Sequence, residues 1–340
     1  MKRTILYVVL AFIVAPIFVS CYQSHKKKLD LAYALVESRP DSALALMKHI
    51  DQEGLSKEEM AKYALTYYIA QDKSGLDLDN DSLIRIAYDW YEGHQEDSLY
   101  VLCLNYMGKF YLLVDSMEQA KSCLEKAYFI SDSLHKMNVK RLVLDKLIEV
   151  EEQLEPYKAL RYAKDMLKMY DSMANVTIYN KVAARLRLGE NFFYVGSLQH
   201  ALEEERKAYR MAMKAGDSNL LSYVRQNLAS TFEEMGEKDS CLYYARLAYD
   251  LNAANRFSCL LTFASAYISV DSLNQAFSLL NQALPKTAED RYSVFYFQSQ
   301  AAMKAQDFNS AKSFSDSAYH YLEDMYRTAL QGKAAYYTSF

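Results

Sequence analysis

The feature that most constrains this chain is an internal repeat of small and aromatic residues. In four segments a small residue is followed by an aromatic residue three positions later, a small residue nine positions further on and another after seven more. The four sets are Gly108, Tyr111, Ala120 and Ala127; Gly189, Phe192, Ala201 and Ala208; Ala229, Phe232, Cys241 and Ala248; and Ala264, Tyr267, Ala276 and Ala283. Spacings of three, four and seven keep residues on one stripe of an α-helix. The pattern therefore predicts helix pairs repeated along the chain.

Small residues at fixed places in both helices of a pair indicate close packing. A residue such as Gly108 or Gly189 lets the second helix of the pair approach the first, and the aromatic residues fill the groove between neighbouring pairs. The chain has only 9 Gly and 4 Pro among 340 residues, fewer than a β-sandwich or a dinucleotide-binding enzyme needs for turns and phosphate loops. We therefore expect long helices joined by short connections.

This arrangement resembles that of the tetratricopeptide repeat (TPR) family. Weaker copies extend it in both directions, and the anchor positions of all copies are Ala43, Leu83, Ala120, Ala159, Ala201, Cys241, Ala276 and Ala311. Successive anchors are 35 to 42 residues apart, close to the 34 residues of a standard TPR unit. The resemblance implies an all-α fold, a right-handed α-solenoid of about eight TPR-like helical hairpins. It implies that the array covers residues 29–328, followed by a C-terminal tail at 329–340.

Polar pairs recur just before the second helix of several hairpins. Examples are Asp115-Ser116, Gly196-Ser197 and Asp271-Ser272. Ser116 and Ser272 each have a Gln three residues later, which is the pattern of a capping box. We interpret these recurring residues as helix caps rather than as nucleophiles or metal ligands.

The N-terminus has the pattern of an export signal. A basic start at residues 2–3 precedes an uncharged, mostly apolar run from Ile5 to Val19. This run is shorter than the roughly 20 residues of a transmembrane helix and matches the apolar core of a secretory signal.

The end of this run resembles the lipobox of bacterial lipoproteins, in which a small residue precedes an acylated Cys. Here Ser20 precedes Cys21, and Phe18 stands where the family has Leu. The resemblance implies a signal peptide at 1–20, a lipid on Cys21, a polar tether at 21–28 and an exported, membrane-anchored lipoprotein facing the periplasm. An uncleaved anchor and an ordinary signal peptide with an incidental Cys remain as alternatives.

The sequence carries no motif of a known catalytic or cofactor site. The six His residues are scattered, without a His-Glu-x-x-His pair, and no phosphate-binding or nucleophile-elbow motif occurs. Asp77, Asp79 and Asp81 resemble the start of a calcium loop, but Ser82 and Tyr88 replace the Gly and Glu that such a loop needs. We therefore expect no enzyme activity, no metal and no cofactor. A net charge of -4 also argues against a nucleic-acid partner.

Four further cysteines, Cys103, Cys123, Cys241 and Cys259, fall within expected helices. Buried free thiols are the simplest interpretation, although an exported protein can oxidise such residues and the pairs Cys103–Cys123 and Cys241–Cys259 stay open.

The TPR resemblance also implies where a partner binds. TPR proteins usually hold a protein or peptide in the concave groove lined by the first helix of each hairpin. Matching the family's groove positions gives Asn105, Lys109, Glu190, Phe193, Tyr194, Gln226, Ser230 and Glu233. The alternative for these residues is an ordinary solvent-facing surface.

We therefore expect a membrane-tethered, non-catalytic protein–protein interaction scaffold. The main alternative is a sensory, ligand-binding ectodomain similar to those of TPR transcription regulators, here without its transmembrane and output parts. An enzyme or glycan-binding lipoprotein is a third class.

Overall fold

The computed structural model describes residues 26–338 except 77, 79, 80, 94–97, 136 and 252, and describes no side chains beyond residue 328. Every regular element in this part of the chain is a helix. A helix at residues 26–35 comes first. It is followed by α2 Pro40–Met47, α3 Lys57–Lys73, α4 Ser82–Tyr91, α5 Ser98–Leu113, α6 Met117–Ser133, α7 Met137–Leu154, α8 Pro156–Ser172, α9 Ile178–Tyr194, α10 Leu198–Ala215, α11 Ser218–Glu234, α12 Lys238–Tyr249, α13 Arg256–Ser269, α14 Leu273–Leu280, α15 Ala288–Lys304 and α16 Phe308–Thr338.

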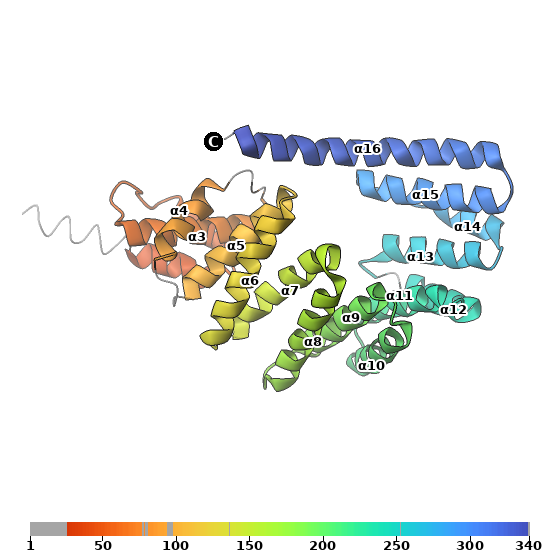
Figure 1. Ribbon diagram of the computed structural model, residues 1–340, viewed down its shortest axis with the longest axis horizontal. Coiled ribbons are helices and arrows are strands. Elements are labelled where there is room, and N and C mark those ends of the chain that lie inside the picture. The colour runs from red at the N-terminus through yellow and green to blue at the C-terminus, as the bar shows by residue number, and fades with distance from the viewer. Residues whose placement is uncertain are drawn as a thin grey trace, which may run out of the picture. The chain divides into compact units, whose positions relative to one another are not determined.

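Consecutive helices form hairpins, as predicted, and six of these hairpins pack as close pairs. The helices α3 and α4, α5 and α6, and α9 and α10 pack as pairs, and so do α11 and α12, α13 and α14, and α15 and α16. Within the second unit, each hairpin follows the previous one in chain order (Figure 1). The all-α solenoid expected from the repeat is confirmed.

Two compact units divide the chain, at residues 1–146 and 147–340. The boundary falls within α7. The first unit contains α2 to α6, and the second contains α8 to α16. We describe each unit by itself.

In the second unit the first helices of successive hairpins contact one another. Helix α9 packs against α11, α11 against α13, and α13 against α15. Direct contact between these helices makes them the inner layer of the stack, with the second helices outside them. The residues predicted to line a groove on α9 and α11 therefore belong to the inner layer.

The predicted small residues lie in the core of their hairpins. Ala120, Ala201, Cys241 and Ala276 are all fully buried. A Cβ atom on Gly108 would stand 2.7 Å from Cγ of Leu124, the buried residue opposite it on α6. The predicted role of Gly108, to let the second helix approach closely, is confirmed.

The recurring turn residues end the first helix of the hairpin. Asp115, Gly196, Gly236, Asp271 and Gln306 all have left-handed backbones, with φ between 53° and 76°. The amide after each one donates to a carbonyl five residues back, for example Ser116 to Tyr111 O and Glu237 to Phe232 O, both at 2.8 Å. This is the Schellman motif, in which a left-handed residue closes a helix C-terminus.

The predicted capping boxes at Ser116 and Ser272 are wrong. Both residues stand at the N-cap of a second helix, but neither side chain makes a capping hydrogen bond. The Schellman turn leads directly into the next helix, so each serine has ψ near 65°. An N-cap residue whose side chain caps the helix normally has an extended backbone instead. Capping boxes occur instead at the start of two first helices, at Ser56 with Glu59 and at Thr287 with Asp290.

The ends of the chain bear on the predicted boundaries. The chain is already helical at residue 26, the first described residue, which lies inside the segment predicted as a tether, and α16 continues through Thr338. The predicted signal peptide and Cys21 lie outside the described residues. None of the described helices is both long enough and apolar enough to cross a membrane.

Candidate functional site

A cavity of about 300 Å³ opens between α9, α10 and α11 in the second unit. It is lined by Glu190, Phe193, Tyr194, Glu205, Asn227, Ser230 and Thr231. Four of these were predicted from the sequence as partner-binding residues: Glu190, Phe193, Tyr194 and Ser230. The other three, Glu205, Asn227 and Thr231, were not predicted.

Glu205 is the most unusual residue of this cavity. It comes from α10, and only 1% of its surface is exposed. Its Oε1 accepts a 2.7 Å hydrogen bond from the Thr231 hydroxyl, and its Oε2 has no hydrogen-bond partner. Burial raises the pKa of Glu205 to about 7, and the nearby negative charge of Glu190 also raises it, against the lowering effect of the Thr231 hydrogen bond. A buried carboxyl group with a free acceptor is costly unless something pairs with it.

The repeat itself places Glu205 in the core. It lies four residues after the anchor Ala201, and the matching positions of other hairpins hold the buried apolar residues Leu124, Ala245 and Leu280. Gly189 makes room for it, because a Cβ atom there would stand 3.2 Å from Glu205 Cγ. A carboxylate at a position that is apolar in most of the other hairpins is the sequence signal that marks Glu205.

The remaining wall of the cavity is polar at one side and aromatic at the other. Asn227 Nδ2 donates to Glu190 Oε1 at 2.9 Å, which ties α11 to α9. The Ser230 hydroxyl donates to the Gln226 carbonyl at 3.2 Å. Phe193 and Tyr194 pack edge to face with ring centres 6.0 Å apart, and Tyr194 stays 59% exposed. The cavity thus combines an aromatic rim with two carboxylates, one half-buried and one at its base.

The other four predicted groove residues lie outside this cavity, and three of them bond to a neighbouring hairpin. On α11, Gln226 Oε1 accepts from Asn255 at 2.9 Å, and Glu233 accepts from Ser265 at 2.6 Å. In the first unit Lys109 forms an ion pair with Asp72 of the preceding hairpin, and Asn105 is buried. Lys109, Gln226 and Glu233 thus make bonds between hairpins, and the structure gathers only four of the eight predicted residues into one cavity.

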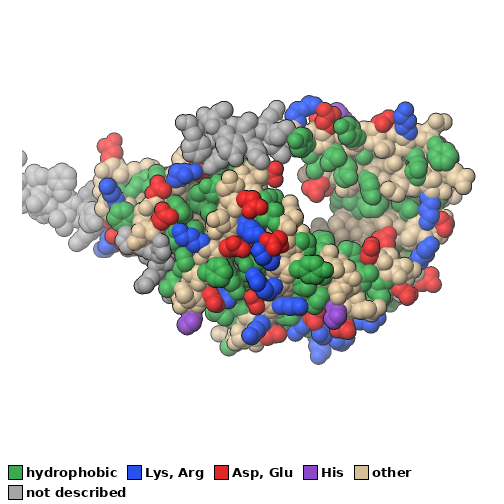
Figure 2. All heavy atoms as spheres, in the orientation of Figure 1, with side chains coloured by type: hydrophobic (Ala, Val, Ile, Leu, Met, Phe, Trp, Pro, Cys, Tyr) green, Lys and Arg blue, Asp and Glu red, His purple; other side chains and the backbone are tan. Residues whose placement is uncertain are grey.

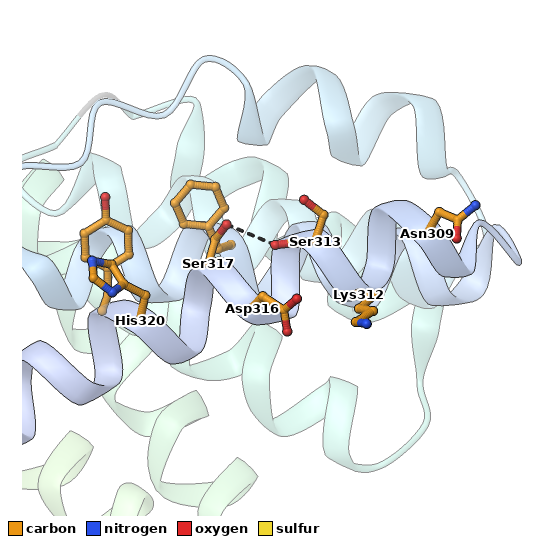
Figure 3. A pocket seen from close by; sticks show the side chains of 8 residues that line it. Asn309, Lys312, Ser313, Asp316, Ser317 and His320 are labelled. Carbon is orange, nitrogen blue, oxygen red and sulfur yellow. Dashed lines mark hydrogen bonds between the residues drawn. The ribbon is translucent and has the colours of Figure 1, made fainter.

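A larger cavity, of about 550 Å³, lies along α15 and α16. Figure 3 shows that its labelled residues, Asn309, Lys312, Ser313, Asp316, Ser317 and His320, all come from α16. Ser317 Oγ donates back to the Ser313 carbonyl at 3.0 Å, and most of the lining is exposed to solvent. This is an open depression along one helix, and none of its lining residues is a buried polar group without a partner.

Charge and thiol chemistry add no second site. On the face in Figure 2, basic and acidic side chains are interspersed over the surface that is drawn in colour. No group of three or more His, Cys, Asp or Glu residues in the described part of the chain has the arrangement to hold a metal ion.

Cys103, Cys123, Cys241 and Cys259 are free thiols. Burial raises the pKa of Cys123 to about 11 and that of Cys241 to about 12, so neither is a ready nucleophile. Asp77 and Asp79, of the calcium-like segment, lie outside the described residues.

Comparison with solved structures gives the fold a name. Neither a family model nor a curated protein matches the chain. It is similar to the apo form of RapI, with a TM-score of 0.66 at 14% identity over 88% of this chain and 86% of that one. It is also similar to a Rap protein complexed with competence and sporulation factor, with a TM-score of 0.62 at 16% identity over 92% and 94% of the two chains. A third similar structure is aspartyl phosphate phosphatase F from Bacillus subtilis, with a TM-score of 0.57 at 16% identity over 93% and 92%. At these identities the likeness is one of fold, and the fold is that of TPR-type helical repeat proteins.

Proposed function

We propose that this chain is a non-catalytic TPR-type scaffold that binds a protein partner through the inner face of its second unit. The observation that carries the proposal is the cavity between α9, α10 and α11, where four predicted groove residues meet on the inner layer of the stack. Inner faces of helical repeat arrays are extended surfaces suited to protein recognition. The similar Rap structure, complexed with competence and sporulation factor, supports the comparison at the level of the fold.

Photo-crosslinking in the host cells tests where the partner binds. A photoreactive phenylalanine replaces Tyr194 on the cavity rim or, as the control, Tyr243 on the second helix α12. Both tyrosines are 59% exposed, so a difference in crosslinking between them reflects their position on the protein and not their exposure. We expect one protein to crosslink at position 194 and not at 243. Equal crosslinking at both, or no protein at 194 while a small molecule raises the thermal stability, would contradict the proposal.

We further propose that the scaffold is exported and tethered to the membrane through a lipid on Cys21, facing the periplasm. The sequence pattern of residues 1–21 supports this. Metabolic labelling with a fatty-acid analogue tests it: we expect label in the wild type and none in Cys21→Ala. Equal labelling of the two chains would refute the lipid anchor.

A further inference from the structure

Glu205 has an acceptor oxygen that nothing in the described structure satisfies. Glu205 lines the cavity, its buried Oε2 has no donor, and no ion pair to this residue occurs among the described residues. The charged residue that acts on it most is Glu190, which has the same sign. Acidic residues this deeply buried are normally paired. The missing partner is therefore a donor, and preferably a cation, from outside the chain.

We propose that this cavity receives a primary ammonium group, the lysine side chain of a bound protein, with Glu205 Oε2 as its principal acceptor. The inference rests on the proposed scaffold function and specifies what the inner face recognises.

The arrangement of acceptors favours an ammonium group over a guanidinium group. A planar guanidinium binds a carboxylate best through both oxygens, but Glu205 Oε1 already accepts from Thr231. An ammonium has three donors that point in different directions. Glu205, Glu190 and Ser230 line the same cavity, and each of these side chains carries an oxygen that can accept a hydrogen bond.

The rim suits the apolar stem of a lysine. Its four methylene groups would pass the rings of Phe193 and Tyr194, and a cation near these ring faces gains further attraction. A cavity of about 300 Å³ has room for one lysine side chain. The site thus accommodates one lysine of a larger partner.

The ionisation of the cavity gives the site a pH dependence. The titratable groups facing Glu205 are Glu190 and Tyr194 of α9, since α11 contributes only Asn227, Ser230 and Thr231. Arg187 lies behind Glu190 and pairs with it at 3.7 Å. Protonated Glu205 cannot hold an ammonium, so with a pKa of about 7 the affinity at pH 5.5 would fall about 30-fold below its plateau at high pH.

The experiment measures the binding of short peptides to the full chain by calorimetry at pH 8. The probe is acetyl-Gly-Lys-Gly-amide, and its matched controls carry norleucine or arginine in place of lysine. A fourth peptide, Gly-norleucine-Gly-amide with a free N-terminus, carries its ammonium on the α-amino group, about half of which is protonated at pH 8. We expect the lysine peptide to bind at least tenfold more tightly than the other three. Equal binding of the norleucine control, preference for the free N-terminus, or no binding of the lysine peptide overturns the proposal.

Two variants locate the binding. Glu205→Gln keeps the shape of the side chain and removes its charge, and Glu203→Gln makes the same change at an exposed position of α10. We expect Glu205→Gln to lose at least tenfold in affinity for the lysine peptide and Glu203→Gln to stay within twofold of the wild type. Unchanged binding by Glu205→Gln overturns the proposal. If that variant does not fold, the carboxyl carbon of Glu205 in the wild type is titrated by NMR, where bound lysine peptide must lower its pKa.

Crosslinking separates this inference from the proposed function. If position 194 captures a protein in cells but the lysine peptide does not bind, the scaffold stands and the ammonium site falls. If no protein is captured at position 194, the scaffold proposal fails whatever the peptide does.

Discussion

At the scale of the single residue, Glu205 makes stability depend on pH. Its folded-state pKa of about 7 lies above the ordinary value of 4.5, so the folded chain holds a proton that the unfolded chain releases. Stability from this group is therefore full below about pH 4.5 and falls as the pH rises through 7, by up to about 3 kcal/mol.

We predict that Glu205→Gln raises the melting temperature at pH 8 and changes it little at pH 5, where the wild-type carboxyl is already protonated. Thermal unfolding followed by circular dichroism at both pH values measures the difference, with Glu203→Gln as the control. A variant less stable than the wild type at pH 8 would mean that Glu205 is paired and charged in the folded protein.

A second residue-scale prediction concerns Gly108 in α5. In an open helix, replacement of Gly by Ala stabilises by about 1 kcal/mol. Here the new Cβ would lie 2.7 Å from Leu124 Cγ, and overpacking of a buried contact costs about 1–3 kcal/mol. We predict that Gly108→Ala destabilises the protein in urea titration. The double variant Gly108→Ala with Leu124→Ala should lose less unfolding free energy than the two single variants lose together. If the two losses were fully additive, the contact with Leu124 would not be the cause.

The role of Gly108 was predictable because a small residue recurs at the same position of several repeats, which indicates that the helices pack closely there. Glu205 was not predicted for a related reason: it breaks the repeat, and a single carboxylate at a core position matches no catalytic or metal-binding motif. Asn227 and Thr231 could not be predicted either. Which polar side chains of α11 meet the cavity depends on how α10 packs against α11, and the spacing within one helix does not fix that packing.

At the scale of the element, the turns between helices depend on backbone conformation. Gly236 has φ of 76°, and a Cβ atom there would contact nothing within 4 Å. Gly236→Ala therefore tests conformational strain alone, and we predict a loss of about 1 kcal/mol in unfolding free energy. Ser272→Ala is the comparison, because Ser272 makes no capping hydrogen bond, and it should change stability by less than about 0.5 kcal/mol. If Ser272→Ala cost more unfolding free energy than Gly236→Ala, the capping-box interpretation of the serines would be correct after all.

Helix positions were predictable within a few residues, whereas their caps were not. The predicted anchors Ala120 and Ala201 lie in the first turns of α6 Met117–Ser133 and α10 Leu198–Ala215. The periodic spacing of hydrophobic and small residues extends over a whole helix and corresponds to its packed face, so it predicts the position of the helix well. A serine with a glutamine three residues later is only a local pattern. At Ser116 and Ser272 the preceding residue has a left-handed backbone, and this conformation determines how the chain enters the second helix.

At the scale of the molecule, two compact units imply two regions that open separately. Helical repeats contact mainly their neighbours, so a local loss of stability spreads along the stack by adjacent interfaces. The chain divides at residues 146 and 147, and Gly108 lies well inside the first unit. We predict that Gly108→Ala speeds amide hydrogen exchange in α3 to α6 by about tenfold or more, the effect of losing about 1.4 kcal/mol, and leaves α11 to α14 within twofold of the wild type. Gly236→Ala is the reciprocal variant, because it should speed exchange in α11 and α12 and spare α3 to α6. If both variants instead speed exchange uniformly over the chain, the array unfolds as one cooperative body and the two units are not independent in stability.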